Sequence, residues 1–346
     1  MISSLEIPRV RMVKGRKGQR IRMEIISEMG YRDRMEKEAV PFLKEHRYCG
    51  FFAPDGQGDI YYERYRQEKA GGTVVMVHGF SESAEKYAEM IYYFLQDGYQ
   101  VYIMDVRGHG RSVRSREDLS MVHIDRYERY LSDLEYLAAE IAAKENPALP
   151  LYLYGHSMGG GIAAAFLEKS PGTFRKAVLS SPMIRPLTGG IPFGAAYGIA
   201  DMQCRLGKGG CYVVGHHAFA GDETFESSAS VSAERYEYYA RKRQSEEKFQ
   251  TNGASYSWLR EAARMSKYIL KEVNCRKITA EVLLFQAERE EYVDKKAQEK
   301  FVSRVESARL VPMAGTKHEI YMSDDGHVVQ YLDEILKFFG EGKALQ

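Results

Sequence analysis

Apolar and amphipathic segments alternate along residues 73–182. The apolar runs are short and continuous, which is typical of strands buried on both faces of a parallel sheet. Between them, hydrophobic positions recur at helical spacing. The strand-like runs are 73–77, 100–105, 149–154 and 174–182, and the helical segments are 84–96, 124–144 and 161–168. This alternation predicts an α/β fold with a doubly wound, mostly parallel sheet.

Further strands and helices flank this region. An antiparallel hairpin is predicted at one edge of the sheet, because two short strand-like runs are joined by a Pro- and Gly-containing turn. The hairpin strands are 48–53 and 60–66, and the alternation resumes late in the chain with 280–287, 295–306, 308–312 and 327–340. We therefore divide the chain into a polar N-terminal arm (1–45), an α/β core (46–182 and 277–346) and a helical cap (183–276) inserted after the sixth strand.

The cap has two halves of different character. Residues 184–206 carry large apolar side chains among small residues, whereas 233–249 are heavily charged and are interpreted as a solvent-facing helix. A third helix begins at Tyr256. The apolar half either packs on the core or lines a substrate pocket, and both interpretations stay open. The candidate pocket residues are Phe193, Tyr197, Trp258 and Tyr292.

Composition excludes several classes of protein. The 49 Lys and Arg nearly cancel the 48 Asp and Glu, so no strong field attracts nucleic acid. No signal-peptide pattern and no run of eighteen apolar residues is present, which indicates a cytoplasmic protein and leaves room only for transient contact with a membrane surface. The composition does not predict an oligomeric state.

The four cysteines are scattered, which is typical of reduced thiols rather than a disulfide framework. Cys204 and Cys211 precede His216 and His217, but the glycines between them and the lack of a CxxC pair favour a loop over a zinc site. We therefore expect no metal.

One motif points to nucleophilic catalysis. Gly155-His-Ser157-Met-Gly159 follows a predicted strand and precedes a predicted helix, which is the setting of a nucleophile elbow. The small flanking residues allow the strained turn that exposes the serine hydroxyl above the N-terminus of a helix.

Chemistry-bearing residues follow the other predicted strands. Because ligands bind at the carboxyl ends of parallel strands, these residues are expected to meet. A serine needs a base such as histidine, which in turn needs an acceptor that fixes its tautomer. The strand ends carry His78-Gly79-Phe80, Ser157, the acidic group Glu288, Glu290 and Glu291, and His318. Their order along the chain is serine, carboxylate, histidine.

The sequence resembles the α/β-hydrolase superfamily, in particular monoacylglycerol lipases and bacterial lysophospholipases. The similarity extends over residues 48–340. It includes His78-Gly-Phe80, Asp105-Val-Arg-Gly-His-Gly-Arg-Ser112, Gly155-His-Ser-Met-Gly-Gly160 and Thr316-Lys-His-Glu-Ile320. The resemblance implies that Ser157 is the nucleophile, that His318 is the general base, and that the main-chain N–H groups of Phe80 and Met158 form the oxyanion hole.

The third member of the triad departs from the family pattern. Glu290 stands where relatives carry an aspartate, and glutamate is compatible with this role. Glu288 and Asp294 are the competing candidates, and Asp294 has the rival interpretation of an N-cap to the helix at Lys295.

These features predict two-step acyl transfer without a cofactor, on a single-chain lipid ester such as a monoacylglycerol or a lysophospholipid. Arg185 and Arg205 are available for a lysophospholipid headgroup. Alternatives are a small-ester hydrolase, a proline-type aminopeptidase that holds the substrate amine with Asp201 or Asp222, and a non-catalytic binding protein of the same fold.

Overall fold

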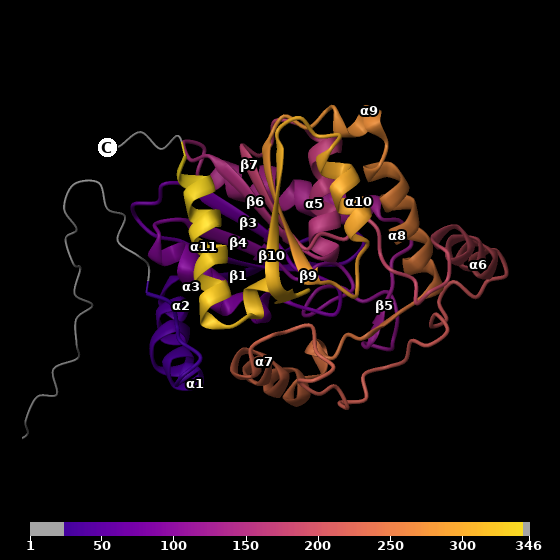
Figure 1. The fold of residues 1–346 in the computed structure, drawn as a ribbon, viewed down its shortest axis with the longest axis horizontal. Coiled ribbons are helices and arrows are strands. Elements are labelled where there is room, and N and C mark those ends of the chain that lie inside the picture. Colours follow the sequence, from indigo (N-terminus) through magenta and orange to yellow (C-terminus); the bar gives the residue numbers. More distant parts are fainter. Residues whose placement is uncertain (1–23, 342–346) are drawn as a thin grey trace, which may run out of the picture.

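The computed structural model describes residues 24–341, which fold around an eight-stranded sheet (Figure 1). The strands are β1 (Arg47–Phe52), β2 (Ile60–Tyr65), β3 (Thr73–Val77), β4 (Gln100–Met104), β6 (Leu151–His156), β7 (Lys176–Ser180), β9 (Glu281–Arg289) and β10 (Ala308–Lys317). Their order in the sheet is β1-β2-β4-β3-β6-β7-β9-β10. Only β2 runs antiparallel to its neighbours. The predicted doubly wound, mostly parallel α/β sheet is confirmed.

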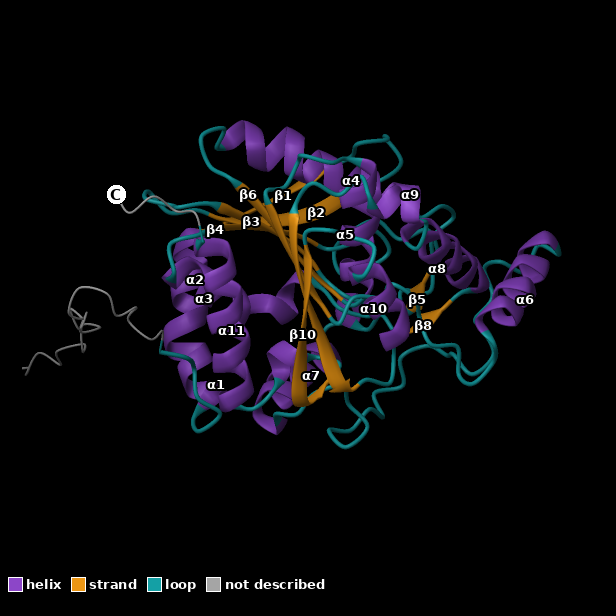
Figure 2. Ribbon diagram, turned by 45° about the horizontal axis from the view of Figure 1, so that its top comes forward, coloured by secondary structure: helices purple, strands orange, loops and turns teal. Residues whose placement is uncertain are grey.

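Helices cover both faces of the sheet. They are α1 (Tyr31–Arg34), α2 (Val40–His46), α3 (Ala88–Gln96), α4 (Glu128–Glu135), α5 (Met158–Lys169), α10 (Lys295–Val302) and α11 (Asp325–Gly340). Figure 2 shows α1, α2, α3 and α11 on one side of the sheet, and α4, α5 and α10 on the other. Each of the two helical layers packs on its face of the sheet, and a separate cluster of buried apolar side chains lies at each interface.

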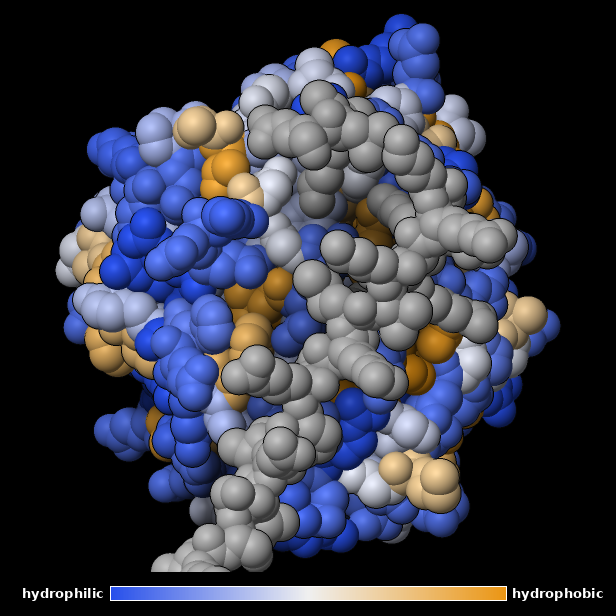
Figure 3. Space-filling model, turned by 90° about the vertical axis from the view of Figure 1, so that its left-hand side faces the viewer, coloured by the Kyte–Doolittle hydropathy of each residue, from blue (hydrophilic) through white to orange (hydrophobic). Residues whose placement is uncertain are grey.

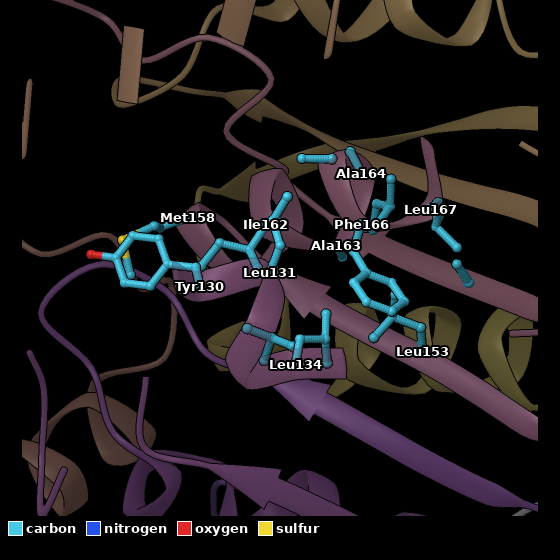
Figure 4. Packing of buried hydrophobic residues seen from close by; sticks show 14 of the residues in the cluster. Tyr130, Leu131, Leu134, Leu153, Met158, Ile162, Ala163, Ala164, Phe166 and Leu167 are labelled. Atoms are coloured by element: carbon cyan, nitrogen blue, oxygen red, sulfur yellow. The ribbon is translucent and has the colours of Figure 1, made fainter. Parts of the chain in front are cut away.

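Helix α5, which follows the serine, is buried almost throughout. Figure 4 shows its side chains packed beside Leu153 of β6 and the α4 residues Leu131 and Leu134. Phe166 is fully buried there. A helix enclosed on all sides in this way holds its N-terminus in a fixed position.

The helix predicted over 124–144 begins later than the pattern suggests. Residues ahead of it form the short strand β5 (Met121–Val122), which pairs with β8 (Gly253–Ala254) of the cap, and α4 starts only at Glu128. A π-helical stretch, Tyr136–Ala143, completes the helix. Hydrogen bonds from the cap hold the 120–122 segment extended, which the local pattern does not reveal.

The described part of the predicted N-terminal arm packs onto the core. Tyr31, Met35, Ala39 and Leu43 recur every fourth residue and are buried in the same apolar cluster as α3. Figure 3 views this side of the molecule, where the coloured surface is largely hydrophilic with scattered hydrophobic residues. The first part of the arm lies outside the described residues, and with it the basic residues Arg9, Arg11, Lys14, Arg16 and Lys17.

The segment between β7 and β9 contains α6 (Phe193–Arg205), α7 (Ala233–Ser245), α8 (Tyr256–Ile269) and α9 (Glu272–Cys275). Helix α8 packs on α5, whereas α6 contacts α8 and projects away from the body in both ribbon views (Figures 1 and 2). The interpretation of 233–249 as a solvent-facing helix is wrong for one face of α7. Arg235 is fully buried on that face, because it binds Glu89 of α3 in a charge-assisted pair.

Candidate active site

Ser157 occupies a strained turn between β6 and α5. Its backbone has φ 51° and ψ −118°, a conformation that L-residues rarely adopt. The neighbouring glycines make the turn possible: a Cβ on Gly159 would overlap the carbonyl oxygen of Val77, and one on Gly155 would lie 2.7 Å from the carbonyl oxygen of Gly159. The sequence motif therefore has the backbone geometry of a nucleophile elbow.

Hydrogen bonds join Ser157, His318 and Glu290 in series. His318 Nε2 lies 2.8 Å from Ser157 Oγ, and His318 Nδ1 lies 2.8 Å from Glu290 Oε2. With the proton on Nδ1, the imidazole donates to Glu290 and accepts from the Ser157 hydroxyl. The arrangement is that of a nucleophile, a base and an orienting carboxylate, assembled from the ends of β6, β9 and β10.

The two competing carboxylates bind elsewhere. Glu288 accepts the main-chain N–H of Gly315 at 2.7 Å. Asp294 caps α10, where it accepts from Lys296 N at 2.9 Å, and it pairs with Arg185. Among the three acidic candidates, Glu290 is the one whose side chain contacts His318.

Glu290 is held in its ionised form. Burial by itself would raise the pKa of its carboxyl, but the adjacent His318 and the N–H groups of Tyr292 and Val293 outweigh burial and lower the pKa below its usual value. The Glu290 side chain is 0% exposed and that of His318 is 6% exposed. An ionised carboxylate in this position stabilises a positive charge on the imidazole.

The two predicted oxyanion donors flank the serine. Met158 is the first residue of α5, where a helix leaves its main-chain N–H groups without intrahelical partners. Phe80 follows β3, and its ring contacts the Trp258 ring at 4.7 Å between centroids. Within residues 24–341, no acceptor is recorded for either N–H group. Both therefore stay available to a charge that develops beside Ser157.

The sequence pattern did not identify Glu82, which binds the turn at Gly79 that precedes Phe80. Its buried carboxylate accepts the N–H of Gly79 at 2.6 Å and the hydroxyls of Tyr87 at 2.7 Å and Tyr321 at 2.9 Å. Burial would raise the pKa of Glu82, but Lys86 and His156 lower it well below its usual value. No local pattern marks this residue, because its partners come from three separate segments.

Other polar residues near the strand ends hold loops. His78 Nε2 accepts from Val106 N at 2.8 Å, and Asp105 accepts from Ala84 N at 2.7 Å and Arg111 N at 2.8 Å. These contacts show that His78 and Asp105 hold the loops that follow β3 and β4.

A cavity of about 940 Å³ opens above Ser157 and His318. Trp258 and Tyr292 line it as predicted. The apolar residues of its wall are Met183, Pro186, Leu187, Ile191, Ala196, Ile199, Val213, Val214, Leu259 and Val293. This volume is sufficient for a chain-like ligand with one polar end.

Phe193 and Tyr197 are not part of this wall, which corrects their assignment as pocket residues. The Tyr197 ring packs against Lys267 of α8, whose Nζ lies 3.3 Å from the ring centroid. The Phe193 ring packs against Arg185, whose Cζ lies 5.0 Å from the ring centroid. The α6 residues that line the cavity are Ala196 and Ile199.

No group of three or more metal-ligating side chains is close enough together to bind a metal ion in the part of the chain that the structure describes. All four cysteines are unpaired. Over the same residues, no helix has the length and apolarity needed to cross a membrane.

Comparison with known proteins relates this geometry to a family. A family model described as "Serine aminopeptidase, S33" matches residues 68–325, well over half of the chain. Lysophospholipase L2 of Escherichia coli is 28% identical over 289 residues, which cover 81% of this chain and 84% of that protein. Monoacylglycerol lipase of Mycolicibacterium smegmatis is 39% identical over 138 residues, covering 40% of this chain and 46% of the relative.

The fold recurs in solved structures. A soluble variant of monoglyceride lipase from Saccharomyces cerevisiae, in complex with a substrate analog, superposes with a TM-score of 0.69. The alignment covers 86% of this chain and 96% of that chain at 17% sequence identity, so this likeness concerns the fold alone.

Proposed function

The chain belongs to the serine aminopeptidase S33 family, and we propose that it is a serine hydrolase that cleaves carboxylic esters of single-chain lipids, such as a monoacylglycerol or a lysophospholipid. The family match and the named relatives confirm the resemblance to α/β-hydrolases of the monoacylglycerol lipase and lysophospholipase type. The observation that carries the proposal is the hydrogen-bonded series Ser157–His318–Glu290 at the floor of a cavity with an apolar wall.

The proposed reaction is two-step acyl transfer. His318 Nε2 takes the proton of Ser157 Oγ as that oxygen attacks the ester carbonyl, and the N–H groups of Phe80 and Met158 bind the oxyanion. Protonated His318 then passes its proton to the departing alcohol. Water, activated by the same imidazole, releases the acyl group from Ser157. Glu290 stays ionised throughout and stabilises the imidazolium, so these steps need no cofactor.

The acyl chain lies along the apolar wall contributed by α6 and α8. Burial of each methylene favours binding by about 0.8 kcal/mol, so affinity rises with chain length until the wall ends. Several side chains of this wall are also exposed, and we propose that they make transient contact with a lipid surface together with the exposed Met202 and Leu206. The exposed wall residues are Leu187, Ile191, Ile199 and Val214.

We assign the protein to the cytoplasm. The unpaired state of Cys49, Cys204, Cys211 and Cys275 supports this location, because thiols persist in a reducing compartment.

The test is hydrolysis of 4-nitrophenyl esters of increasing acyl length, beside a monoacylglycerol and a lysophosphatidylcholine, by the wild type and Ser157→Ala. We expect serine-dependent turnover with kcat/KM rising from short to long chains. Turnover confined to the shortest esters would contradict the lipid assignment and favour a small-ester hydrolase. A wild type that fails to react with a fluorophosphonate probe would contradict hydrolysis altogether and favour a binding protein.

A second candidate is an aminopeptidase, which the family description names. Asp222 lines the cavity and has an exposed carboxylate that suits a substrate ammonium, whereas Asp201 pairs with Arg205 outside it. Hydrolysis of proline 4-nitroanilide faster than any long-chain ester would favour this candidate.

A further inference from the structure

Beyond Ser157 the cavity continues into a region of different chemistry, on the side of α7. This region, which we name the polar chamber, shares Phe80, Glu223, Arg243 and Glu319 with the main cavity. Lys86 also lines it. Residues of α6 and α8 contribute to the apolar wall, whereas residues of α7 line the polar chamber, and α6 and α7 lie apart in both ribbon views (Figures 1 and 2).

Arg243 is the cation at the junction of the two spaces. Its side chain is nine-tenths buried and packs over the Phe219 ring at 4.6 Å. It donates to Glu223 at 2.6 Å, to the carbonyl oxygen of Thr251 at 2.8 Å and to the side-chain oxygen of Asn252 at 3.3 Å.

These contacts leave part of the guanidinium unused. An arginine carries five N–H donors, and three are engaged here, so two remain. One of the two is on Nε, which is buried and has no acceptor in the described chain. The other is the second N–H of Nη1, the nitrogen that also binds Glu223. An anionic group that approached Arg243 through the cavity would accept from this donor in a charge-assisted hydrogen bond.

Lys86, the second cation, is already neutralised. It pairs with Glu82 at 3.2 Å and with Glu319. Arg243 has one carboxylate partner, Glu223, whose side chain is 44% exposed at the rim. Arg243 is therefore the cation with capacity for a further anion.

The main cavity also carries a carboxylate without a recorded ion pair. Asp222 lines the cavity, is exposed, and has no ion pair recorded among residues 24–341. Asp222 and Arg243 both line the main cavity, which therefore presents an arginine with spare donors and an aspartate without an ion pair. A ligand that carried an anion followed by a cation would satisfy both.

The two arginines expected from the sequence to meet a headgroup do not line the cavity. Arg185 pairs with Asp294 at 3.1 Å, and Arg205 pairs with Asp201 on the exposed side of α6.

We propose that the polar chamber and the adjoining wall of the main cavity form a headgroup site for a zwitterionic phosphodiester, in which Arg243, shared by the two spaces, binds the phosphate and Asp222 of the main cavity binds the ammonium. This inference rests on the proposed lipid hydrolase function and narrows its substrate to a lysophospholipid. The acyl chain lies on the α6 and α8 side, the ester carbonyl lies at Ser157, and the headgroup lies on the α7 side. A neutral glycerol headgroup would leave Asp222 without an ion pair and the spare donors of Arg243 without an anionic acceptor.

The experiment compares kcat/KM for three substrates with one short acyl chain, used below their critical micelle concentrations. They are monoacylglycerol, lysophosphatidic acid, which has a phosphate without an ammonium, and lysophosphatidylethanolamine, which has both. We expect the wild type to prefer lysophosphatidylethanolamine. Arg243→Gln should lower the ratio of either phosphate substrate to monoacylglycerol by about tenfold or more, as loss of a charged hydrogen bond does.

Asp222→Asn separates the two charges. It should lower the ratio of lysophosphatidylethanolamine to lysophosphatidic acid by several-fold, and because Asp222 is exposed and unpaired its replacement leaves folding intact. Arg241→Gln is the matched control, since Arg241 lies on the same helix and pairs with Glu237 on the exposed surface.

Outcomes of two kinds would overturn the site. Equal losses on all three substrates in Arg243→Gln would assign Arg243 a structural role only, and an unchanged ratio in Asp222→Asn would exclude the ammonium contact. A wild type that prefers monoacylglycerol would contradict the headgroup site but would still be consistent with the proposed lipid hydrolysis. Absence of hydrolysis of every lipid, in contrast, would contradict the proposed function itself. If Arg243→Gln does not fold, Asp222→Asn and Arg243→Lys decide the question.

Discussion

Gly79 donates its main-chain N–H to the buried carboxylate of Glu82 at 2.6 Å. The next residue, Phe80, carries one of the two proposed oxyanion donors. Glu82 also lies 3.4 Å from His156 Nδ1, and the His156 ring stands 5.0 Å from that of His318. The Glu82 carboxylate thus fixes the turn that positions the Phe80 N–H. It also contacts His156, whose ring lies next to that of His318.

Replacing this carboxylate should impair catalysis more than binding. In Glu82→Gln the amide oxygen has to serve several donors alone, so the Gly79 turn shifts. We expect kcat to fall about tenfold or more with a smaller change in KM. Tyr87→Phe, which removes one donor to Glu82 and spares the Gly79 contact, should lower kcat less. Steady-state kinetics on a long-chain 4-nitrophenyl ester measures both, and a folded Glu82→Gln with the wild-type kcat would refute this positioning role.

A second prediction concerns the triad acid. Glu290→Gln removes the charge that orients His318 and stabilises its protonated form, so kcat should fall by about 10³- to 10⁴-fold. Glu288→Gln is the control on the same loop, because Glu288 binds Gly315 N–H and not the imidazole. Comparable losses in the two variants would show that the loop as a whole, rather than the Glu290 carboxylate, supports the reaction.

The sequence predicts these parts of the site because each lies in a local pattern. Ser157 sits in a glycine-flanked turn, and Glu290 and His318 follow apolar runs that end at the same edge of the sheet. Parallel pairing alone then brings them together. The choice between Glu290 and Asp294 required the loop conformation, which the residue pattern does not contain.

The cap was harder to predict, because its side chains are placed by partners far along the chain. Arg235 belongs to a strongly charged segment, yet it is buried against Glu89, which is 146 residues away. Tyr197, a candidate pocket residue of the apolar half, instead packs against Lys267 of α8 and does not line the cavity. Composition identifies an apolar half and a charged half, and only the packing decides which face of each helix is inside.

The buried pair between Arg235 and Glu89 leads to a prediction about stability. The guanidinium makes three contacts to Glu89, at 3.0, 3.1 and 3.2 Å, and it also binds the carbonyl oxygens of Ile26 and Ser323. Arg235→Met would leave Glu89 charged and buried, which costs about 3–5 kcal/mol. Arg241→Gln on the exposed face should cost about 1 kcal/mol or less. Urea unfolding compares the two variants, and equal small losses would show that Arg235 does not anchor α7.

Glu168 of α5 is a buried carboxyl outside the catalytic series. Neither of its oxygens has a hydrogen-bond partner in the described chain, and the side chain packs near Cys275, whose thiol donates to the carbonyl oxygen of Ile269. Burial raises the pKa of Glu168 to about 9, and Cys275 and Lys277 offset only part of this effect. At neutral pH the folded protein therefore holds this carboxyl protonated.

This protonation makes the stability of the wild type fall as pH rises. Between the ordinary pKa of 4.5 and about 9, the unfolded chain has lost the Glu168 proton and the folded chain retains it. The folded state then binds one more proton, so its stability falls with increasing pH by up to about 1.4 kcal/mol per unit and levels off above pH 9. Glu168→Gln mimics the protonated side chain, and we expect urea midpoints that change less from pH 5 to 9 and exceed the wild type at pH 8–9. Glu135→Gln, an exposed control that pairs with Lys169, should follow the wild-type profile. Parallel profiles for the wild type and Glu168→Gln would mean that Glu168 ionises without cost in the folded core.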